Sequence, residues 1–114
     1  MATIAPTMTV IPGGKGRLYQ WTLTNGDDGA PIEAVEFADR SVQVAGTFGG
    51  ASVAIEGSND SAAYATLTDP QGNDLAIVGA KVEMITEVTR LIRPRVVGGA
   101  GTIVTVSLLA RFTA

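Results

Sequence analysis

The fold class is decided by the stretch Ser41-Val42-Gln43-Val44-Ala45-Gly46-Thr47-Phe48-Gly49-Gly50-Ala51-Ser52-Val53-Ala54-Ile55-Glu56. On both sides of the glycine pair, large apolar residues alternate with small or polar ones. A period of two residues is typical of a β-strand with one buried face, and a glycine pair between two such runs favours a tight turn. The stretch therefore predicts two strands joined as a hairpin, with one shared apolar face.

The same alternation extends to either side of this stretch. Strands are predicted at residues 17–24, 42–48, 52–56, 64–67, 75–78, 82–88, 89–97 and 102–111. Residues 31–38 are compatible with an extended edge segment or with a short helical turn, and residues 83–90 contain enough helix formers for one helical turn, although a strand is preferred there. Pro94 has no backbone N–H to donate, so we expect its strand at a sheet edge or at a bulge. The strand at 102–111 is expected in the centre of a sheet.

About eight strands in succession, without helical crossovers, predict an all-β fold. The natural architecture is an antiparallel two-sheet β-sandwich that is jelly-roll-like. Residues 17–114 are predicted to form this single domain. Residues 1–16 contain Pro6, Pro12 and the flexible run Gly13-Gly14-Lys15-Gly16, and they are predicted to be an extended N-terminal arm.

The composition limits what the chain can do. Of its 114 residues, 46% are hydrophobic and 17% are charged, below the roughly 25% charged residues of average domains. The surface must therefore be rich in small uncharged residues, which suits packing against another protein. The sequence contains no cysteine and no histidine, which excludes thiolate and imidazole chemistry. We expect neither catalysis nor a cofactor.

Charge and hydropathy also restrict the partners. The formal net charge is −3, whereas nucleic-acid binding needs a basic surface that releases counterions. No apolar run approaches the roughly 20 residues that span a bilayer, and residues 1–12 lack a basic start typical of a signal peptide. We therefore expect no nucleic-acid partner and no membrane partner.

Three local patterns invite a chemical interpretation, and each has a plainer one. Gly13-Gly14-Lys15-Gly16 lacks the spacing of a phosphate loop and is more typical of a linker. The oxygen-bearing side chains of the polar loops would bind calcium if those loops met, but such residues also form turns; they are Asn59, Asp60, Asp69 and Asp74. The carboxylate pairs Glu33/Glu36 and Glu83/Glu87 would suit a glycosidase, yet no motif supports one.

Arg90, Arg93 and Arg95 form the most prominent charge cluster. Guanidinium groups bind carboxylates through two hydrogen bonds and are enriched at interfaces. The alternative is pairing within the chain, with Glu56, Glu83, Glu87 or Asp60 across neighbouring strands. The aromatic residues are expected in the core or at its seams; they are Tyr19, Trp21, Phe37, Phe48 and Phe112.

Four stretches together resemble a family of small proteins that decorate the capsids of tailed bacteriophages. They are residues 41–60, residues 64–73, the segment Ile92-Arg93-Pro94-Arg95-Val96 and residues 104–111, and they lie in the last two thirds of the chain. The resemblance implies a jelly-roll cement protein that binds the outside of the capsid shell where major capsid proteins meet. It also implies a virion location after synthesis in the host cytoplasm.

On this interpretation the partners are the major capsid protein and further copies of the chain, as a dimer or trimer. The candidate interface residues are Ile4, Pro6, Met8, Lys15, Arg17, Arg93 and Arg95. The loops at 25–31 and 98–101 are expected to touch the shell or a sister subunit. The segment from Glu56 to Asp60 is also similar to galactose-binding-like modules, so a jelly-roll carbohydrate-binding module remains the alternative. A buried Trp21 would count against it, because sugars stack on exposed rings.

Overall fold

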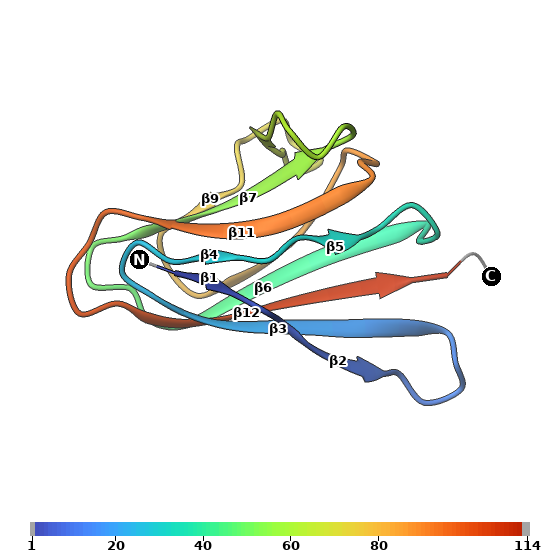
Figure 1. The fold of residues 1–114 in the computed structure, drawn as a ribbon, viewed down its shortest axis with the longest axis horizontal. Coiled ribbons are helices and arrows are strands. Elements are labelled where there is room, and N and C mark those ends of the chain that lie inside the picture. Colours follow the sequence, from blue (N-terminus) through green and yellow to red (C-terminus); the bar gives the residue numbers. More distant parts are fainter. Residues whose placement is uncertain (1, 113–114) are drawn as a thin grey trace.

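The structure, a computed structural model, describes residues 2–112, which form twelve β-strands and no helix (Figure 1). The strands are β1 (Thr3–Ile4), β2 (Thr7–Val10), β3 (Gly16–Thr24), β4 (Asp28–Gly29), β5 (Ile32–Glu33), β6 (Asp39–Thr47), β7 (Ser52–Ser58), β8 (Ala65–Thr66), β9 (Ala76–Ile77), β10 (Lys81–Met84), β11 (Leu91–Val97) and β12 (Ile103–Arg111). Within this part of the chain, therefore, no helix is long and apolar enough to cross a membrane.

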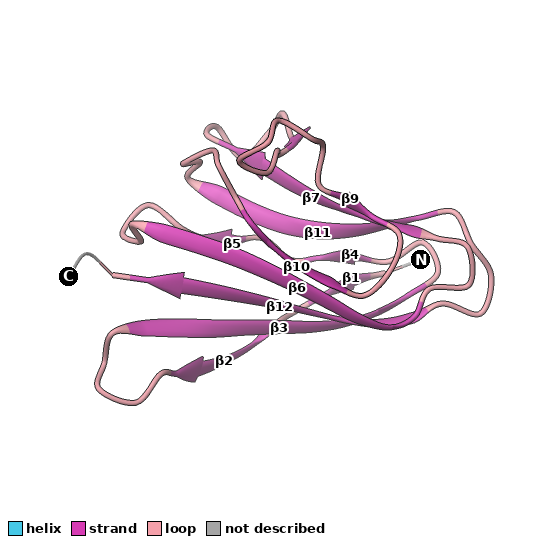
Figure 2. Cartoon of the chain, turned by 180° about the vertical axis from the view of Figure 1, so that it is seen from behind, coloured by secondary structure: helices cyan, strands magenta, loops and turns pink. Residues whose placement is uncertain are grey.

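The strands form two sheets. Sheet A has seven strands in the order β1-β4-β11-β7-β8, with β5 also beside β11 and β9 also beside β7. Sheet B has five strands in the order β10-β6-β12-β3-β2. Figure 2 shows the strands of sheet B side by side as one layer, with β7 and β11 in the other layer. The predicted all-β two-sheet sandwich is confirmed.

The strand count exceeds the predicted eight because five of the twelve strands have only two residues each. Such short pairings leave no alternation that a sequence pattern could detect. All pairings are antiparallel except the one between β1 and β4, which is parallel. The predicted central position of the last strand is confirmed, since β12 pairs with β6 on one side and with β3 on the other.

The core lies between the two sheets and follows from the alternation within the long strands. Trp21 and Leu23 of β3 point inward, as do the valines of β12, and all are essentially inaccessible to solvent. Val53 and Ile55 of β7 meet them from sheet A. Trp21 Nε1 donates a hydrogen bond to the carbonyl oxygen of Ala30, which satisfies its polar atom inside the core.

The predicted hairpin across Gly49-Gly50 is wrong. β6 belongs to sheet B and β7 to sheet A, so the glycine pair connects the two layers as an arch. Alternation could not distinguish the two arrangements, because the apolar faces of β6 and β7 cover one core in either case. Gly49 has a φ of +60°, and a Cβ added to it would lie 2.0 Å from the carbonyl oxygen of Ala100.

Of the two predicted positions of Pro94, the sheet edge is wrong, whereas the bulge has a counterpart in the register: two residues of β11 separate Ile92 from Arg95, and three residues separate their partners Ile32 and Asp28. β11 lies inside sheet A, with β7 on one side and both β4 and β5 on the other. β4 pairs with β11 at Arg95, whereas β5 pairs with it at Leu91 and Ile92. Pro94 therefore faces the interval between two short strands, where no ladder hydrogen bond is needed. The sequence does not show that a neighbouring strand is interrupted.

The described part of the predicted arm, residues 2–16, is paired with both sheets. β1 lies beside β4 in sheet A, and β2 lies beside β3 at the edge of sheet B. The backbone N–H of Ala2 donates to Asp27 Oδ1 at 3.0 Å, which fastens the start of the segment. Residue 1 of the arm and residues 113–114 of the predicted domain lie outside the described residues.

Candidate docking face

The outer face of sheet B carries one pair of charged side chains, Asp39 and Arg111, where β6 begins and β12 ends, and otherwise only uncharged ones. Register places on this face Thr7, Thr9, Leu18, Gln20, Thr22, Thr24, Ser41, Gln43, Ala45, Thr47, Val82, Met84, Ile103, Thr105, Ser107 and Leu109. In β3, β6 and β12 they alternate with inward-facing residues, most of which are buried in the core. We call this surface the docking face, because covering an uncharged side chain costs far less desolvation free energy than covering a charged one, provided that its polar atoms find hydrogen-bond partners.

The docking face is hollowed near one end. A depression of about 310 Å³ is lined by Asp39, Arg40, Ser41, Met84, Leu109 and Arg111. Met84 and Leu109 supply apolar walls, and Met84 is half exposed. The ion pair between Arg111 and Asp39 closes the rim at the end of β6 and β12. Such a hollow fits one projecting side chain of a partner.

Buried Arg40 supports this end of the sheet from the inside. Its side chain is 2% exposed, and its guanidinium donates to the carbonyl oxygens of Ala34, Phe37 and Glu87. Its Nε has no hydrogen-bond partner among the described residues. Burial lowers the pKa of Arg40 below its usual value. Arg40 therefore fastens the 34–37 turn and residue 87 to β6, and the sequence pattern did not reveal this role.

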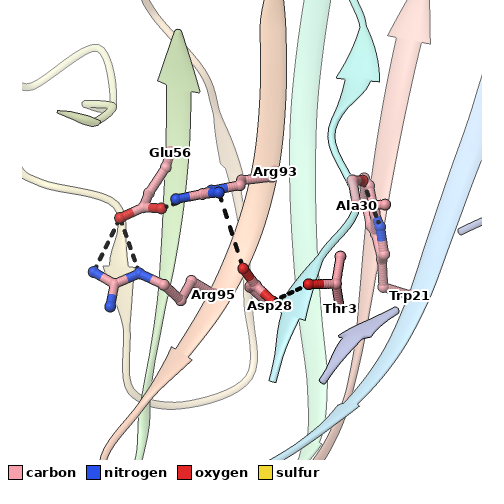
Figure 3. A network of polar contacts seen from close by, with 7 residues as sticks. All are labelled: Thr3, Trp21, Asp28, Ala30, Glu56, Arg93 and Arg95. Carbon is pink, nitrogen blue, oxygen red and sulfur yellow. Dashed lines mark hydrogen bonds and ion pairs between the residues drawn. The ribbon is translucent and has the colours of Figure 1, made fainter. Parts of the chain in front are cut away.

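The outer face of sheet A is different, because it carries a network of charges (Figure 3). Glu56 of β7 is nearly buried and binds two arginines of β11. Arg93 Nε donates to Glu56 Oε1 at 3.0 Å, and Arg95 Nε donates to Glu56 Oε2 at 3.1 Å. Register explains the arrangement, since Arg93 lies directly opposite Glu56 and Arg95 lies two residues further along β11.

Further contacts hold Arg93 in place. Its guanidinium carbon lies 3.8 Å from the centre of the Tyr64 ring, and its Nη1 lies 3.9 Å from Asp28 Oδ2. Thr3 Oγ1 in turn donates to Asp28 Oδ1. Arg90 pairs with exposed Glu33 instead. Thus all three arginines pair with carboxylates of the same chain, but of the four expected partners they use Glu56 alone, and Arg95 keeps 45% of its side chain exposed.

The structure separates the predicted interface residues into two groups. Ile4, Pro6, Met8, Lys15 and Arg17 lie in or next to β1, β2 and the start of β3, whereas Arg93 and Arg95 lie in β11. Of the first group, Ile4 is in sheet A, as β11 is, and Met8 and Arg17 are in sheet B. In the first group Ile4 packs against the core, and Arg17 pairs with Glu36 and lies over the ring of Phe112. Met8 is 49% exposed. The sequence reasoning missed the docking face, whose residues are individually unremarkable.

The loop residues considered for calcium organise turns. Asp60 Oδ1 accepts from the backbone N–H groups of Ala62 and Ala63, and Asp69 Oδ1 accepts from those of Gln71 and Asn73. The N–H groups of Ala63 and Ala62 lower the pKa of Asp60. Within residues 2–112, no three Asp or Glu side chains come together as metal ligands. These observations favour the turn-forming interpretation.

The two considered pairs of glutamates do not form acid–base pairs in the structure. Burial would raise the pKa of Glu87, but hydrogen bonds from the hydroxyl and the N–H of Thr68 outweigh this effect and lower it. Glu83 pairs with Lys81, Glu33 with Arg90, and Glu36 with Arg17. Each carboxylate thus has a structural contact of its own.

Comparisons with known proteins add information on the fold. No known protein family matches the sequence, and no curated protein matches it significantly. Among solved structures, the SPBc2 prophage-derived protein YomS is similar, with a TM-score of 0.62 at 11% identity over 82% of this chain and 92% of YomS. A cupin domain from Bordetella pertussis Tohama I has a TM-score of 0.53 at 14% identity over 100% and 99% of the two chains. Both likenesses support the jelly-roll-like β-sandwich.

Proposed function

We propose that the chain is a structural protein of a phage virion that binds the outer surface of the capsid shell and bridges major capsid proteins. The observation that carries the proposal is the docking face, a five-stranded surface whose rows contain no charged side chain apart from the paired Asp39 and Arg111 at one end. In this proposal the chain acts by binding and has no catalytic role. It is made in the host cytoplasm and resides on the capsid exterior.

The chemistry of the docking face suits permanent attachment. A charged group that is buried at an interface needs a partner charge, whereas threonine, serine and aliphatic groups do not. The rigid sheet presents these groups in fixed rows, so little conformational entropy is lost on binding. The hollow beside Met84 and Leu109 offers a pocket for an anchoring side chain of the shell.

Two further points support a virion role. The resemblance of residues 41–60 and 92–96 to capsid decoration proteins points the same way, and YomS, with a similar fold, is a prophage-derived protein. Repetition over a symmetric shell also lets contacts of moderate strength act together when each copy bridges several capsid proteins. A small rigid domain is sufficient for this purpose.

A carbohydrate-binding role has less support. Trp21 is 1% exposed and Phe37 is 2% exposed, so neither ring is available for stacking on a sugar. The face of Tyr64 is occupied by Arg93. A sugar site would have to rely on other residues.

The test is co-sedimentation with capsid shells that lack the protein, using a matched pair of variants. Thr22→Lys places a charge on the docking face, and Thr66→Lys places the same charge on the outer face of sheet A; both threonines are exposed. We expect saturable binding of the unmodified chain, at least about tenfold weaker binding of Thr22→Lys, and unchanged binding of Thr66→Lys. A higher rupture temperature of the loaded shells would support stabilisation.

Three results would overturn the proposal. The first is no saturable binding of the unmodified chain at low and at high salt. The second is equal binding of both variants and the unmodified chain, which would remove the docking face from the interface. The third is binding without any change in the rupture temperature, which would leave attachment but exclude reinforcement.

A further inference from the structure

The outer edge of β2 has no neighbouring strand among the described residues, and a proline lies beyond each end of it. β2 is the last strand of sheet B, and all four of its residues are exposed. Met8 and Val10 are 49% and 57% exposed, although they lie on the same side of the sheet as the core residues. Unpaired edges tend to recruit further strands, and proteins usually protect them with charge or proline. β2 itself contains neither.

The hydrogen-bond pattern shows which backbone groups point away from the sheet. Ile11 N donates to Gly16 O at 3.0 Å, and this pair continues the register of β2 and β3. In antiparallel pairing, hydrogen-bonded pairs alternate with non-hydrogen-bonded pairs. Thr7 and Thr9 therefore bond to β3, whereas the N–H and C=O groups of Met8 and Val10 point outward.

Prolines limit this free edge at both ends. Pro6 and Pro12 occupy the next two positions with the same outward orientation, and proline has no N–H to donate. The edge therefore offers two donors and two acceptors between Pro6 and Pro12, on Met8 and Val10. This arrangement is symmetric about Thr9.

We propose that β2 pairs antiparallel with β2 of a second copy of this chain about a two-fold axis at Thr9. Met8 of each copy then faces Val10 of the other, and their outward N–H and C=O groups form four hydrogen bonds between the chains. In this register Pro6 faces Pro12 of the second copy, so the ladder ends where the donors end. The pairing stops at two copies, because each copy has a single free β2 edge and uses it in this contact.

The side chains of β2 complement themselves in this register. Thr9 meets Thr9 of the second copy on the docking-face side, and threonine pairs are favourable across antiparallel strands. Met8 and Val10 of the two copies cover one another on the other side. The five-stranded sheet B becomes a continuous sheet over two copies, and the two docking faces adjoin.

The opposite edge of sheet B shows why β2 is the edge that pairs. β10 also has four residues, and Ile85 N donates to Arg40 O in the register of β10 and β6, so Val82 and Met84 point their backbone groups outward. The equivalent two-fold axis would pass through Glu83 and would place Glu83 opposite Glu83 of the second copy. Like charges directly opposite are destabilising. Glu83 therefore protects the edge of β10 against pairing with a second copy, whereas β2 has the uncharged Thr9 at the equivalent position.

The test is the molar mass of the purified chain in solution, measured by sedimentation equilibrium without shells. We expect association beyond the 11.7 kDa monomer towards a dimer of twice that mass. Thr9→Glu would place two like-charged side chains directly opposite each other at the axis, with their Cβ atoms about 5 Å apart, and we expect it to raise the dissociation constant at least about tenfold. Thr7→Glu is the matched control, because the two positions lie about 13 Å apart in the proposed register.

The outcomes separate this proposal from the proposed function. A monomer at concentrations of about 100 μM, or a dimer equally stable in Thr9→Glu, overturns the β2 pairing and leaves shell binding to its own test. Equal weakening by Thr7→Glu and Thr9→Glu overturns the register. A monomer that gains protection of the Met8 and Val10 amides from hydrogen exchange only on shells would assign the edge to a shell strand and overturn the proposal.

Discussion

Single side chains hold the loops of this sandwich to its strands. Buried Asp27 accepts hydrogen bonds from the backbone N–H and the hydroxyl of Thr24, and it also accepts from the N–H of Ala2. The N–H of Thr24, then its hydroxyl, lower the pKa of Asp27, and these bonds outweigh the effect of burial. The β3–β4 turn and the start of the chain thus depend on one ionised carboxylate.

This dependence predicts how stability responds to acid. The pKa of Asp27 is lower in the folded chain than its ordinary value of 3.8, so the folded state binds the proton less readily. The stability that the ionised group adds is complete above the unfolded value and is lost as the pH falls through the folded value. For Asp27→Asn we expect a loss of about 1–2 kcal/mol at pH 7 and a smaller difference near pH 2.5.

Urea unfolding at the two pH values measures both differences. Asp39→Asn is the control, because Asp39 forms an exposed ion pair with Arg111, and such pairs contribute about 0–1 kcal/mol. A difference between Asp27→Asn and the unmodified chain that is the same at both pH values would contradict the explanation.

At the scale of elements, alternation predicts where the long strands lie but not which sheet each one joins. The predicted strands at 17–24 and 102–111 coincide with β3 and β12, because their buried faces are continuous. The arch at Gly49-Gly50 was predicted as a hairpin, since the partner of a strand depends on contacts distant in sequence. The docking face could not be predicted for the same reason: its rows exist only once the register of five strands is known.

The packing of the arch on the 98–101 turn leads to a prediction about the stability of glycine variants that a hairpin would not give. Gly49 and Gly50 both have positive φ, but only Gly49 is close to another segment, at the carbonyl of Ala100. Gly50→Ala should therefore cost about 1–2 kcal/mol from backbone strain alone. Gly49→Ala should cost about 1–3 kcal/mol more, because the 98–101 turn must move. Urea unfolding of the two variants checks the order, and equal losses would contradict the packing of the arch on this turn.

At the scale of the whole molecule, the two outer faces differ in kind. Sheet A presents Glu56 with its arginines (Figure 3), and sheet B presents the docking face, whose charged side chains are the paired Asp39 and Arg111 at one end. Because the two outer faces differ, a partner that suits one face does not suit the other. In the proposed dimer, two docking faces adjoin, so one pair would touch the shell over twice the area of a single copy.

Shell binding through the docking face and shell binding through the arginines of sheet A should respond differently to salt. The salt dependence of binding therefore shows which face touches the shell. The Debye length falls from about 10 Å to about 3 Å between 0.1 and 1 M salt, so contacts through exposed charges weaken over this range. If the docking face binds, the dissociation constant for shells should change less than about threefold, and Arg95→Gln should bind like the unmodified chain. If Arg93 and Arg95 contact the shell, as the sequence suggested, binding should weaken with salt and with Arg95→Gln. Co-sedimentation at the two salt concentrations distinguishes these outcomes, because Arg95 is the arginine of the Glu56 network with the more exposed side chain.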